Sequence, residues 1–506
     1  MLNTPFKLWL SAITKDRALM LALCLGTLVH LGLAWLLHLS PDEAHYALYA
    51  SKLDWSYFDH PPLVGWVQWL PLQLGGSDLL MRTVPIMSWL LTALALVYLS
   101  DTVRPDAVAR GPAGVRLDVW LLLLSPLPHL LGLALVPDTL LMPLVCALML
   151  VCWHLRTRQG SQRLGLWLVL GLCLGLAGLA KYTAVLLALG VVIFLARMHG
   201  FALLSLRGPW LAASVAAVCV APVFYWNAQH DWISFSYQLN HAQGANDWRL
   251  RSSLGFVLLL CLAHGVLLLA GLRWLKQHAV VWFLCASFAL PTLLLLVWLA
   301  GRGSALPHWA TPAFIALIPM AAIALSAMWQ QRRQWVLSLG ALQALCCAGL
   351  LMLMAIGGVS QEYGTQARSL PTAQSHAGPP NPFADLYGWD KAAQKAQALA
   401  LREQLPSLAV MNWSLASRIA WYARPLPVTV LDERADQFDL WFGSIQPQDS
   451  VLLVDWSRMS FAPPVGAQQF ERCVWLDQMP VYHLGQQVAH FNFLRCHHWR
   501  GAGGLV

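Results

Sequence analysis

A cluster of acidic and aromatic residues follows directly on the first long apolar segment of the chain. It consists of Ser40–Tyr46, with the sequence SPDEAHY, and Tyr57–Leu63, with the sequence YFDHPPL. Carboxylates beside a bilayer are costly unless they face water, a partner or a substrate. Their concentration in the first loop therefore predicts a polar reaction chamber at the membrane surface, which is typical of a membrane enzyme.

The first part of this cluster has the pattern of a helix start. Ser40 and Glu43 form the S-x-x-E capping box, with a proline in the favoured first helical position between them. On a helix that begins here, Asp42, Tyr46 and Tyr49 share one face. Asp42 is therefore a candidate catalytic carboxylate, although a favourable contact with the helix dipole is an alternative role. Glu43 is a second catalytic candidate, and the capping role is its alternative.

The second part places a carboxylate and an imidazole side by side at Asp59 and His60, before two prolines that restrict the backbone. A carboxylate can ligate a divalent cation, and an imidazole can ligate one or, when protonated, pair with an anion. The pair is a candidate phosphate or metal site. Two ligands without a third make a weak metal signal, and a hydrogen-bonded turn is the alternative.

Two isolated charges lie in tight turns between later apolar segments, Asp138 in V-P-D-T and Lys181 in L-A-K-Y-T. A lone lysine at a span end often extends to the interface for solvation alone. Both residues are expected on the same side of the membrane as Asp42 and Asp59, where they could converge on one cavity. Lys181 beside Asp138 would form an anion-binding centre suited to a phosphorylated lipid.

The composition is that of a membrane protein. Hydrophobic residues make up 58% of the 506 residues and charged residues 11%, whereas a soluble domain has roughly a quarter of its residues charged. Apolar segments long enough to cross a bilayer predict about eleven spans. They lie at about residues 18–38, 80–100, 118–136, 138–155, 164–180, 182–196, 208–226, 253–272, 279–300, 309–328 and 335–357. The first segment is too long for a signal peptide and lacks a small-residue cleavage site.

Basic residues predict the orientation, because Lys and Arg collect in cytoplasmic loops. Every second loop is basic here, so the N-terminus is expected in the cytoplasm and the tail in the periplasm of a bacterial inner membrane. Lys and Arg outnumber Asp and Glu by 21 to 12 up to residue 357, whereas the tail has 11 against 12. The net charge of +8 therefore comes from loops that face the cytoplasm. It gives no indication of nucleic-acid binding.

We expect two domains, a multispanning domain at residues 1–357, with an external catalytic loop at about 39–79, and a periplasmic domain at residues 358–506. A Pro/Gly/Ser/Gln-rich linker, Gly357–Pro382, precedes a helical stretch, Lys391–Glu403. Short apolar runs bounded by turn residues then predict a small α/β domain, and they lie at Leu408–Met411, Pro427–Leu431 and Ser450–Val454. Cys473 and Cys496 in this tail are candidates for a disulfide, with two buried free thiols as the alternative.

The acidic motifs resemble the bacterial glycosyltransferases related to protein mannosyltransferases, within the GT-C superfamily of lipid-linked sugar transferases. The resemblance runs the length of the chain and continues in Pro137–Leu141, Lys181–Ala184, Pro222–Phe235, His308–Ala313, Tyr387–Asp390 and Gln437–Trp441. The lipid A aminoarabinose transferases look like more distant relatives, with Glu-Lys-Pro-Pro where this chain has Asp59-His60-Pro61-Pro62. Here His60 replaces the lysine, and His45 stands where an arginine is expected.

The resemblance implies a GT-C fold and an enzyme that takes a sugar from a polyprenyl-phosphate donor and attaches it, with inversion, to a lipid, glycan or protein acceptor. Modification of lipopolysaccharide in the cell envelope is one such reaction. Asp42 would be the catalytic carboxylate. Neutralisation of the phosphate would then fall on Lys181 or on a divalent metal ion at Asp59 and His60, and no other cofactor is expected. The residues implied to bind substrate are His45, Tyr46, Tyr57, Asp59, His60, Asp138, Lys181 and Tyr182.

Two other activities remain open from the residues. A transporter or flippase for a polyprenyl-linked lipid would also have many spans and an acidic external cavity. A ligase that transfers a whole oligosaccharide would share the donor chemistry. The one-sided distribution of the charges and the external tail favour the transferase.

Overall fold

The computed structural model describes residue 9 and residues 11–104, 108–243, 247–272, 278–358, 381–432, 434–458 and 470–500. By its tertiary contacts the chain divides into two compact units. The membrane unit comprises Met1–Gly32, Leu53–Val67 and Arg82–Ala348, and the sheet unit comprises Leu33–Lys52, Gln68–Met81 and Gly349–Val506. Residues 359–380 of the predicted linker lie outside the described residues.

Apolar helices build the membrane unit, and its two helices α2 and α20 continue into the sheet unit. They are α2 (Arg17–Leu36), α4 (Leu63–Trp66), α7 (Thr83–Val103), α8 (Leu117–Leu123), α9 (Pro126–Leu133), α10 (Pro137–Leu155), α11 (Arg158–Ser161), α12 (Leu164–Ala180), α13 (Val185–His199), α14 (Arg207–Gln229), α15 (Ile233–Gln243), α16 (Leu250–His264), α17 (Val266–Leu272), α18 (Ala279–Gly301), α19 (Thr311–Gln331) and α20 (Arg333–Ile356). Short 3-10 turns, Tyr182–Ala184 and Pro307–Ala310, precede α13 and α19.

The described residues contain eight helices that are long and apolar enough to cross a membrane, or nine if the pair α16 and α17, bent by 102°, forms one span. Two further predicted spans correspond to α12, an apolar helix of 17 residues, and to the pair α8 and α9, which is interrupted at Ser125. The multispanning helical class is confirmed. The count of eleven stays a prediction.

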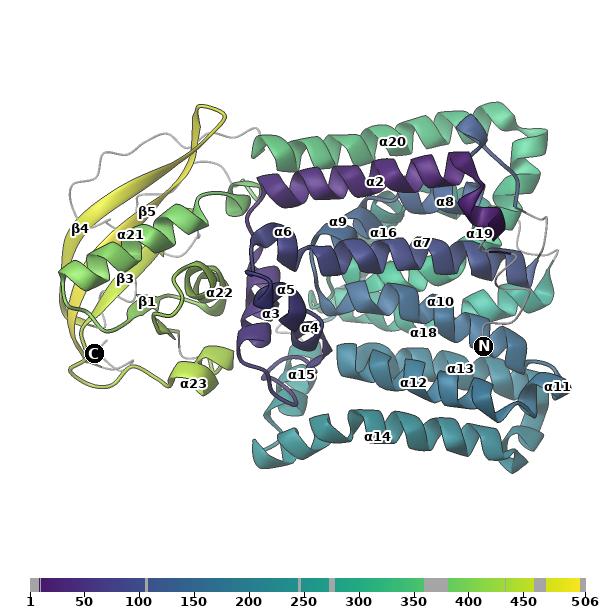
Figure 1. Cartoon of the computed structure of the whole chain (residues 1–506), viewed down its shortest axis with the longest axis horizontal. Coiled ribbons are helices and arrows are strands. Elements are labelled where there is room, and N and C mark those ends of the chain that lie inside the picture. The colour runs from purple at the N-terminus through teal and green to yellow at the C-terminus, as the bar shows by residue number, and fades with distance from the viewer. Residues whose placement is uncertain are drawn as a thin grey trace. The chain divides into compact units, whose positions relative to one another are not determined.

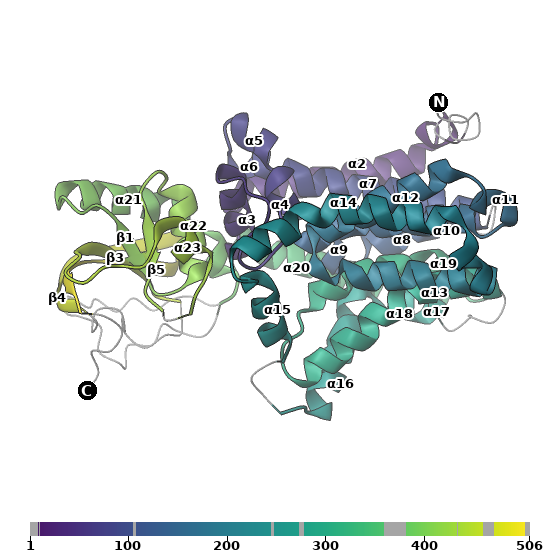
Figure 2. The ribbon, with the colours of Figure 1, turned by 90° about the horizontal axis from the view of Figure 1, so that it is seen from below.

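Helix α10 occupies the middle of the membrane unit, where it contacts α7, α12, α13 and α19. The long helices α7, α10, α12 and α14 lie side by side in this order (Figure 1), and the turned view in Figure 2 shows α16 leaving this bundle at an angle. A proline starts α10, and the Thr139 hydroxyl satisfies the backbone at this end by accepting a bond from Val136 N (3.2 Å) and donating to Ala134 O (3.0 Å). This local cap fixes the first turn of α10, in which Asp138 lies.

The sheet unit combines a mixed sheet with short helices. Its elements are α3 (Pro41–Ser51), α5 (Trp69–Gln73), α6 (Asp78–Met81), α21 (Trp389–Arg402), β1 (Leu408–Val410), α22 (Trp413–Tyr422), β2 (Val428–Val430), α23 (Gln437–Phe442), β3 (Val451–Trp456), β4 (Phe470–His483) and β5 (Gln486–Trp499). The strand order is β2-β1-β3-β5-β4. The β1 strand is parallel to β2 and β3, whereas β5 is antiparallel to β3 and β4.

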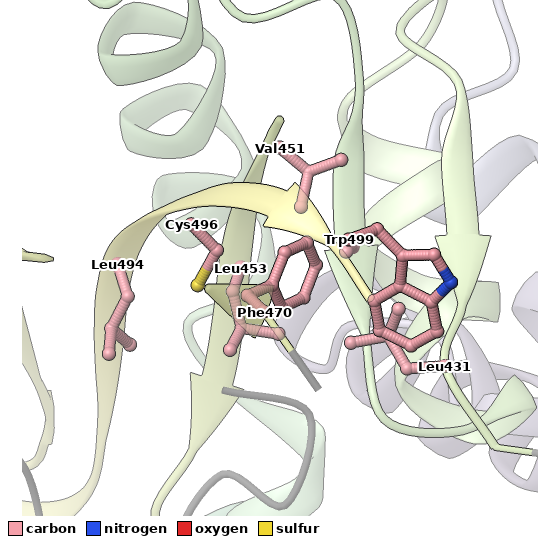
Figure 3. Close-up of a cluster of buried hydrophobic side chains, with 8 residues drawn as sticks. Leu431, Val451, Leu453, Phe470, Leu494, Cys496 and Trp499 are labelled. Carbon is pink, nitrogen blue, oxygen red and sulfur yellow. The ribbon is translucent and has the colours of Figure 1, made fainter. Parts of the chain in front are cut away.

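The core of this sheet is a cluster of buried side chains from five segments. Figure 3 shows Leu431, Val451, Leu453, Phe470, Leu494, Cys496 and Trp499 packed together. Cys473 and Cys496 are directly paired across β4 and β5 and form a disulfide. Of the two alternatives that the sequence left open for these cysteines, the structure has the disulfide. The two strands join through Leu484 and Gly485, both with positive φ, as a two-residue hairpin requires.

The predicted α/β class of the tail is confirmed, and each expected element appears within a few residues of its place. The helical stretch is α21, and the three apolar runs are β1, β2 and β3. The sequence analysis missed α22, α23 and the long β4–β5 hairpin. Much of β4 is only half-buried. Charged and aromatic residues therefore do not alternate strictly along β4 and β5, and no strand pattern is visible in the sequence.

Replacing both disulfide cysteines, Cys473→Ala and Cys496→Ala, should lower the free energy of unfolding of the sheet unit by about 3 kcal/mol, since the bridge closes a loop with a sequence separation of 23. Thermal unfolding monitored by limited proteolysis of the full chain measures this. Cys24→Ala, an exposed free cysteine, is the matched control. Equal stability of the double variant and the wild type under non-reducing conditions would contradict the prediction.

Candidate active site

The acidic helix α3 begins with the predicted capping box. Ser40 accepts a hydrogen bond from Glu43 N (3.5 Å), and the Glu43 carboxylate accepts one from Ser40 N (3.0 Å). Glu43 is buried, with 4% of its surface exposed. Its carboxylate therefore takes part in building the helix, and direct chemistry by Glu43 stays a prediction.

Asp42 lies in the first turn of the same helix and is half-buried. The described residues offer its carboxylate no hydrogen bond or salt bridge. The nearest cation that acts on it electrostatically is Arg418 of α22, which is fully buried and ion-paired with Asp385. Arg418 also stacks 3.7 Å over the ring of Trp389. Asp42 is thus a carboxylate available for a ligand and set close to a buried positive charge.

His45 attaches α3 to the rest of the sheet unit. Its Nδ1 lies 3.2 Å from the hydroxyl of Ser417, and its ring packs among aromatic rings, namely those of Tyr46, Tyr49, Trp413, Phe438 and Trp441. Tyr46 and Tyr49 are neighbours on α3, with ring centroids 5.6 Å apart. Burial raises the pKa of Asp436, which acts electrostatically on His45, to about 6. His45 and Tyr46 are therefore parts of a packed interface within this unit.

Asp59 and His60 lie in the membrane unit on a segment held from α15. Their side chains contact each other at 3.0 Å. Gln238 donates to the Asp59 carbonyl (2.6 Å), and the Ser234 hydroxyl donates to the carbonyl of Tyr57 (2.8 Å). These bonds hold the backbone of the segment, and the contact with His60 holds the Asp59 carboxylate.

Tyr182 links this segment to the end of α12. Its hydroxyl lies 3.3 Å from that of Ser56 and also hydrogen-bonds with Ser234 and Asn227. Asp59 acts electrostatically on the same phenol. Three stretches far apart in sequence, around residues 57, 182 and 230, therefore meet at one polar cluster. Burial raises the pKa of Tyr57, which belongs to this cluster, above its usual range.

Asp138 and Lys181 form a buried ion pair, with the Lys181 ammonium 2.7 Å from the carboxylate. Their side chains are 3% and 8% exposed. Lys181 follows α12 in an extended conformation, so its side chain turns toward the start of α10. His308 Nε2 lies 4.0 Å from the same carboxylate, and the ring of Trp309 lies 4.8 Å from the ammonium. Lys181 and Asp138 therefore lie side by side, as the sequence predicted.

An apolar cavity of about 700 Å³ lies beside this pair, between α13 and the packed helices α12 and α14. It is lined along α12 from Trp167 to Lys181, a length of about 20 Å at 1.5 Å per residue. Tyr182 and Phe235 line it next to Lys181, and nearly all other lining residues are apolar. The cavity therefore places one ammonium group at the end of a long apolar space.

No group of three or more His, Cys, Asp or Glu side chains that could hold a metal ion occurs in the described part of the chain. Asp59 and His60 supply two donors that already contact each other. Catalytic metal sites use about three protein ligands. The donor set does not fit a resident metal ion, and we derive no step through one.

Part of the chain is similar to a known protein family. Residues 59–226 match the model of the dolichyl-phosphate-mannose-protein mannosyltransferase family. The match covers this segment, about a third of the chain. It contains Asp59 and Tyr182 of the polar cluster, the buried pair Asp138–Lys181 and most of the lining of the apolar cavity. The resemblance that the motifs predicted is confirmed.

A curated relative is the lipid A galacturonosyltransferase RgtD of Rhizobium johnstonii, which is 24% identical over 323 residues, or 60% of this chain. The chain spans 64% of the length of this relative.

Two solved structures of ArnT from Cupriavidus metallidurans have the same fold as this chain. The apo structure superposes with a TM-score of 0.58 at 15% identity, and the structure bound to undecaprenyl phosphate with 0.60 at 16%. Each match covers 94% of this chain and 97% of ArnT. The predicted fold class is therefore confirmed over nearly the whole chain, including the parts outside the family domain.

The sequence analysis missed some residues that hold the predicted ones in place. Asn227 and Ser234 lay within a motif that the analysis quoted, yet no role was assigned to them. Ser417 and Arg418 gave no signal, because a serine and an arginine on an amphipathic helix usually face solvent. Only tertiary packing shows that both are buried.

Removing one member of the Asp138–Lys181 pair should be more costly than removing both. Asp138→Asn or Lys181→Met alone should lower the free energy of unfolding by about 3–5 kcal/mol, because each leaves an uncompensated buried charge. The double variant should recover part of this loss. Thermal unfolding of the four proteins in one detergent measures the coupling. Additive losses would show that the two side chains do not interact.

Proposed function

We propose that this protein is a membrane glycosyltransferase that moves a sugar from a polyprenyl-phosphate donor to a lipid acceptor at the periplasmic face of a bacterial inner membrane. Its partners are then the lipid-linked sugar donor, the acceptor and the surrounding membrane lipid. Lipid A is the acceptor class that the named activity of RgtD suggests. Glycan and protein acceptors remain as alternatives.

The observation that carries the proposal is the Lys181 ammonium at the end of the apolar cavity. A polyprenyl phosphate has a long apolar tail and an anionic head, and this arrangement matches both. An ammonium group has three N–H donors, so it can hold Asp138 and a phosphate oxygen at the same time. ArnT, which shares the fold, was solved with undecaprenyl phosphate bound.

The donor phosphate is the leaving group of the proposed reaction. The acceptor oxygen attacks the anomeric carbon, and the bond from that carbon to the phosphate oxygen breaks with its electron pair on the phosphate. The transition state resembles an oxocarbenium ion, and a single displacement inverts the anomeric centre. Lys181, with His308 when protonated, would stabilise the charge that develops on the departing phosphate.

Asp42 takes the proton of the acceptor hydroxyl in this scheme. A general base of this kind is typically worth about two to four orders of magnitude in rate. Its support is the half-buried carboxylate without a hydrogen-bond partner among the described residues, and the buried Arg418, which acts on it electrostatically. Where the acceptor is itself a phosphate, no base is needed, and Asp42 would orient the sugar. Glu43 has a structural role in this proposal, because its carboxylate caps the start of α3.

The remaining site residues have binding roles in this proposal. Asp59, His60, Tyr57 and Tyr182 would contact the head of the donor, because they share the polar cluster beside Lys181. His45 and Tyr46 would support the helix that carries Asp42.

The proposed topology follows the charge distribution. Helix α2 begins next to Lys15 and Arg17, which places the N-terminus in the cytoplasm. Eleven spans would then put the tail in the periplasm, in agreement with its disulfide. The membrane domain would be residues 1–357 and the periplasmic domain residues 358–506, with the acidic segment at 39–79 on the same side.

Asp42→Asn should abolish the sugar transfer and leave folding intact, because the substitution keeps the size and removes the base. Cells that lack the protein would be complemented with the wild type or the variant, and their lipids and surface glycans compared by mass spectrometry. Asp54→Asn, which changes an exposed acid of the same loop, is the control and should restore transfer.

A sugar that returns with the wild type and the control but not with Asp42→Asn would identify the acceptor. Full restoration by Asp42→Asn would remove this carboxylate from catalysis. If all proteins restored one lipid distribution without any change in a glycosidic bond, the activity would be transport.

A further inference from the structure

A second cavity of the membrane unit lies far along the helices from the Asp138–Lys181 pair. The Ser88 hydroxyl, near the start of α7, bonds the carbonyl of Thr139 beside Asp138 (2.7 Å). Asp101 lies near the end of α7, about 20 Å further along at 1.5 Å per residue. The cavity lies there, where α2 begins and α7 ends (Figure 1), and it has a volume of about 520 Å³.

Four basic side chains and two acidic ones line this cavity, namely Lys15, Arg17, Arg110, Arg116, Asp16 and Asp101. Both acids are engaged. Asp16 accepts bonds from Arg110 (2.8 Å) and from the backbone of Leu19 (3.2 Å). Asp101 accepts bonds from Arg116 (2.7 Å) and from the indole of Trp9 (3.1 Å).

Arg116 has a second carboxylate partner, Asp118, which holds its guanidinium with two bonds of 2.7 and 3.1 Å. Lys15 and Arg17 are exposed and have no carboxylate partner within the described residues. Counting Asp118, the cavity has one more positive than negative charge, and Lys15 and Arg17 are its two cations without a carboxylate partner among the described residues. Pairing with carboxylates holds the half-buried Arg116 and the exposed Arg110 guanidiniums in place, and the surplus charge favours an anion.

An exposed apolar face continues from this cavity along α2. Leu21, Leu25 and Leu28, at spacings of four and three, lie on one side of the helix and are 61%, 55% and 57% exposed. In a membrane, acyl chains cover such a face. A molecule with an anionic head and acyl chains could therefore place its head in the cavity and its chains along the helix face.

We propose that this cavity binds the phosphate headgroup of an anionic membrane phospholipid, with the acyl chains along the exposed face of α2. Trp9 would lie at the level of the headgroup, where tryptophan is favoured. Basic residues are expected on the cytoplasmic side of any multispanning membrane protein. The formed cavity, with two cations that lack a carboxylate partner among the described residues, distinguishes this place from an ordinary basic loop. The site is independent of the proposed transferase activity.

The test compares lipid retention by the full chain purified in detergent. The protein is equilibrated with phosphatidylglycerol or phosphatidylcholine, and bound lipid is counted by native mass spectrometry. The wild type should retain phosphatidylglycerol in preference to phosphatidylcholine. Lys15→Gln/Arg17→Gln should weaken this retention roughly 20-fold, given the attraction of each basic residue to an anionic lipid. Both side chains are exposed and unpaired, so the variant should fold normally.

Arg332→Gln/Arg333→Gln is the matched control, since it removes two exposed cations from the turn between α19 and α20. Equal loss of lipid in this control would mean that general surface charge attracts the lipid, and the proposal would be overturned. Unchanged retention by Lys15→Gln/Arg17→Gln would also overturn it. A further arm adds inorganic phosphate. Displacement of the phospholipid by millimolar phosphate would identify a soluble phosphate as the ligand and contradict a lipid site.

Discussion

A buried lysine and aspartate, held together at 2.7 Å, constrain the arrangement of the membrane unit. Desolvation of two charges costs several kcal/mol per ion, and the attraction within the pair repays this only in good geometry. The end of α12 and the start of α10 must therefore meet closely. The Thr139 cap and the extended backbone at Lys181 provide that meeting. Because an apolar pair would serve stability as well, stability alone does not account for these two charges.

The apolar cavity lies directly beside this ion pair. Charged groups within a membrane protein are expensive and typically mark a substrate or ion path. Here a single cation terminates an apolar space that follows α12 for about 20 Å. The surrounding polar cluster, built from the Tyr57 segment, Tyr182 and α15, has its own hydrogen bonds satisfied within the unit. These bonds hold the cluster in place beside Lys181, where we propose that the phosphate head of the donor binds.

The acidic helix α3 depends on a different part of the chain. Its cap is local, but its position is set by contacts with α22, including the bond between His45 and Ser417 across 372 residues. The C-terminal part therefore contributes to the environment of Asp42 through Arg418. Loss of the tail would leave α3 without its packing partner α22.

Features that depend on neighbouring residues in the sequence could be predicted, whereas features that depend on tertiary packing could not. The capping box, the apolar spans and the strands β1 to β3 are encoded in contiguous residues, so pattern and spacing predicted them. The pairing of Asp138 with Lys181 was also accessible, since two isolated charges emerge on the same side of the membrane. Arg418, Ser234 and Gln238 were not, because their burial depends on tertiary packing that no local pattern records. The bend between α16 and α17 falls at Gly265, which has a positive φ, within a segment that was predicted as one span.

The most direct test of the central claim is photo-crosslinking of a polyprenyl phosphate that carries a photoreactive group in its tail. The full chain, in detergent or lipid nanodiscs, would be labelled and the modified peptides mapped. The account predicts labels on α12, α13 or α14, within residues 167–224, competed away by unlabelled polyprenyl phosphate and weakened by Lys181→Met. Labelling outside these helices, or labelling that Lys181→Met leaves unchanged, would contradict a phosphate site at Lys181.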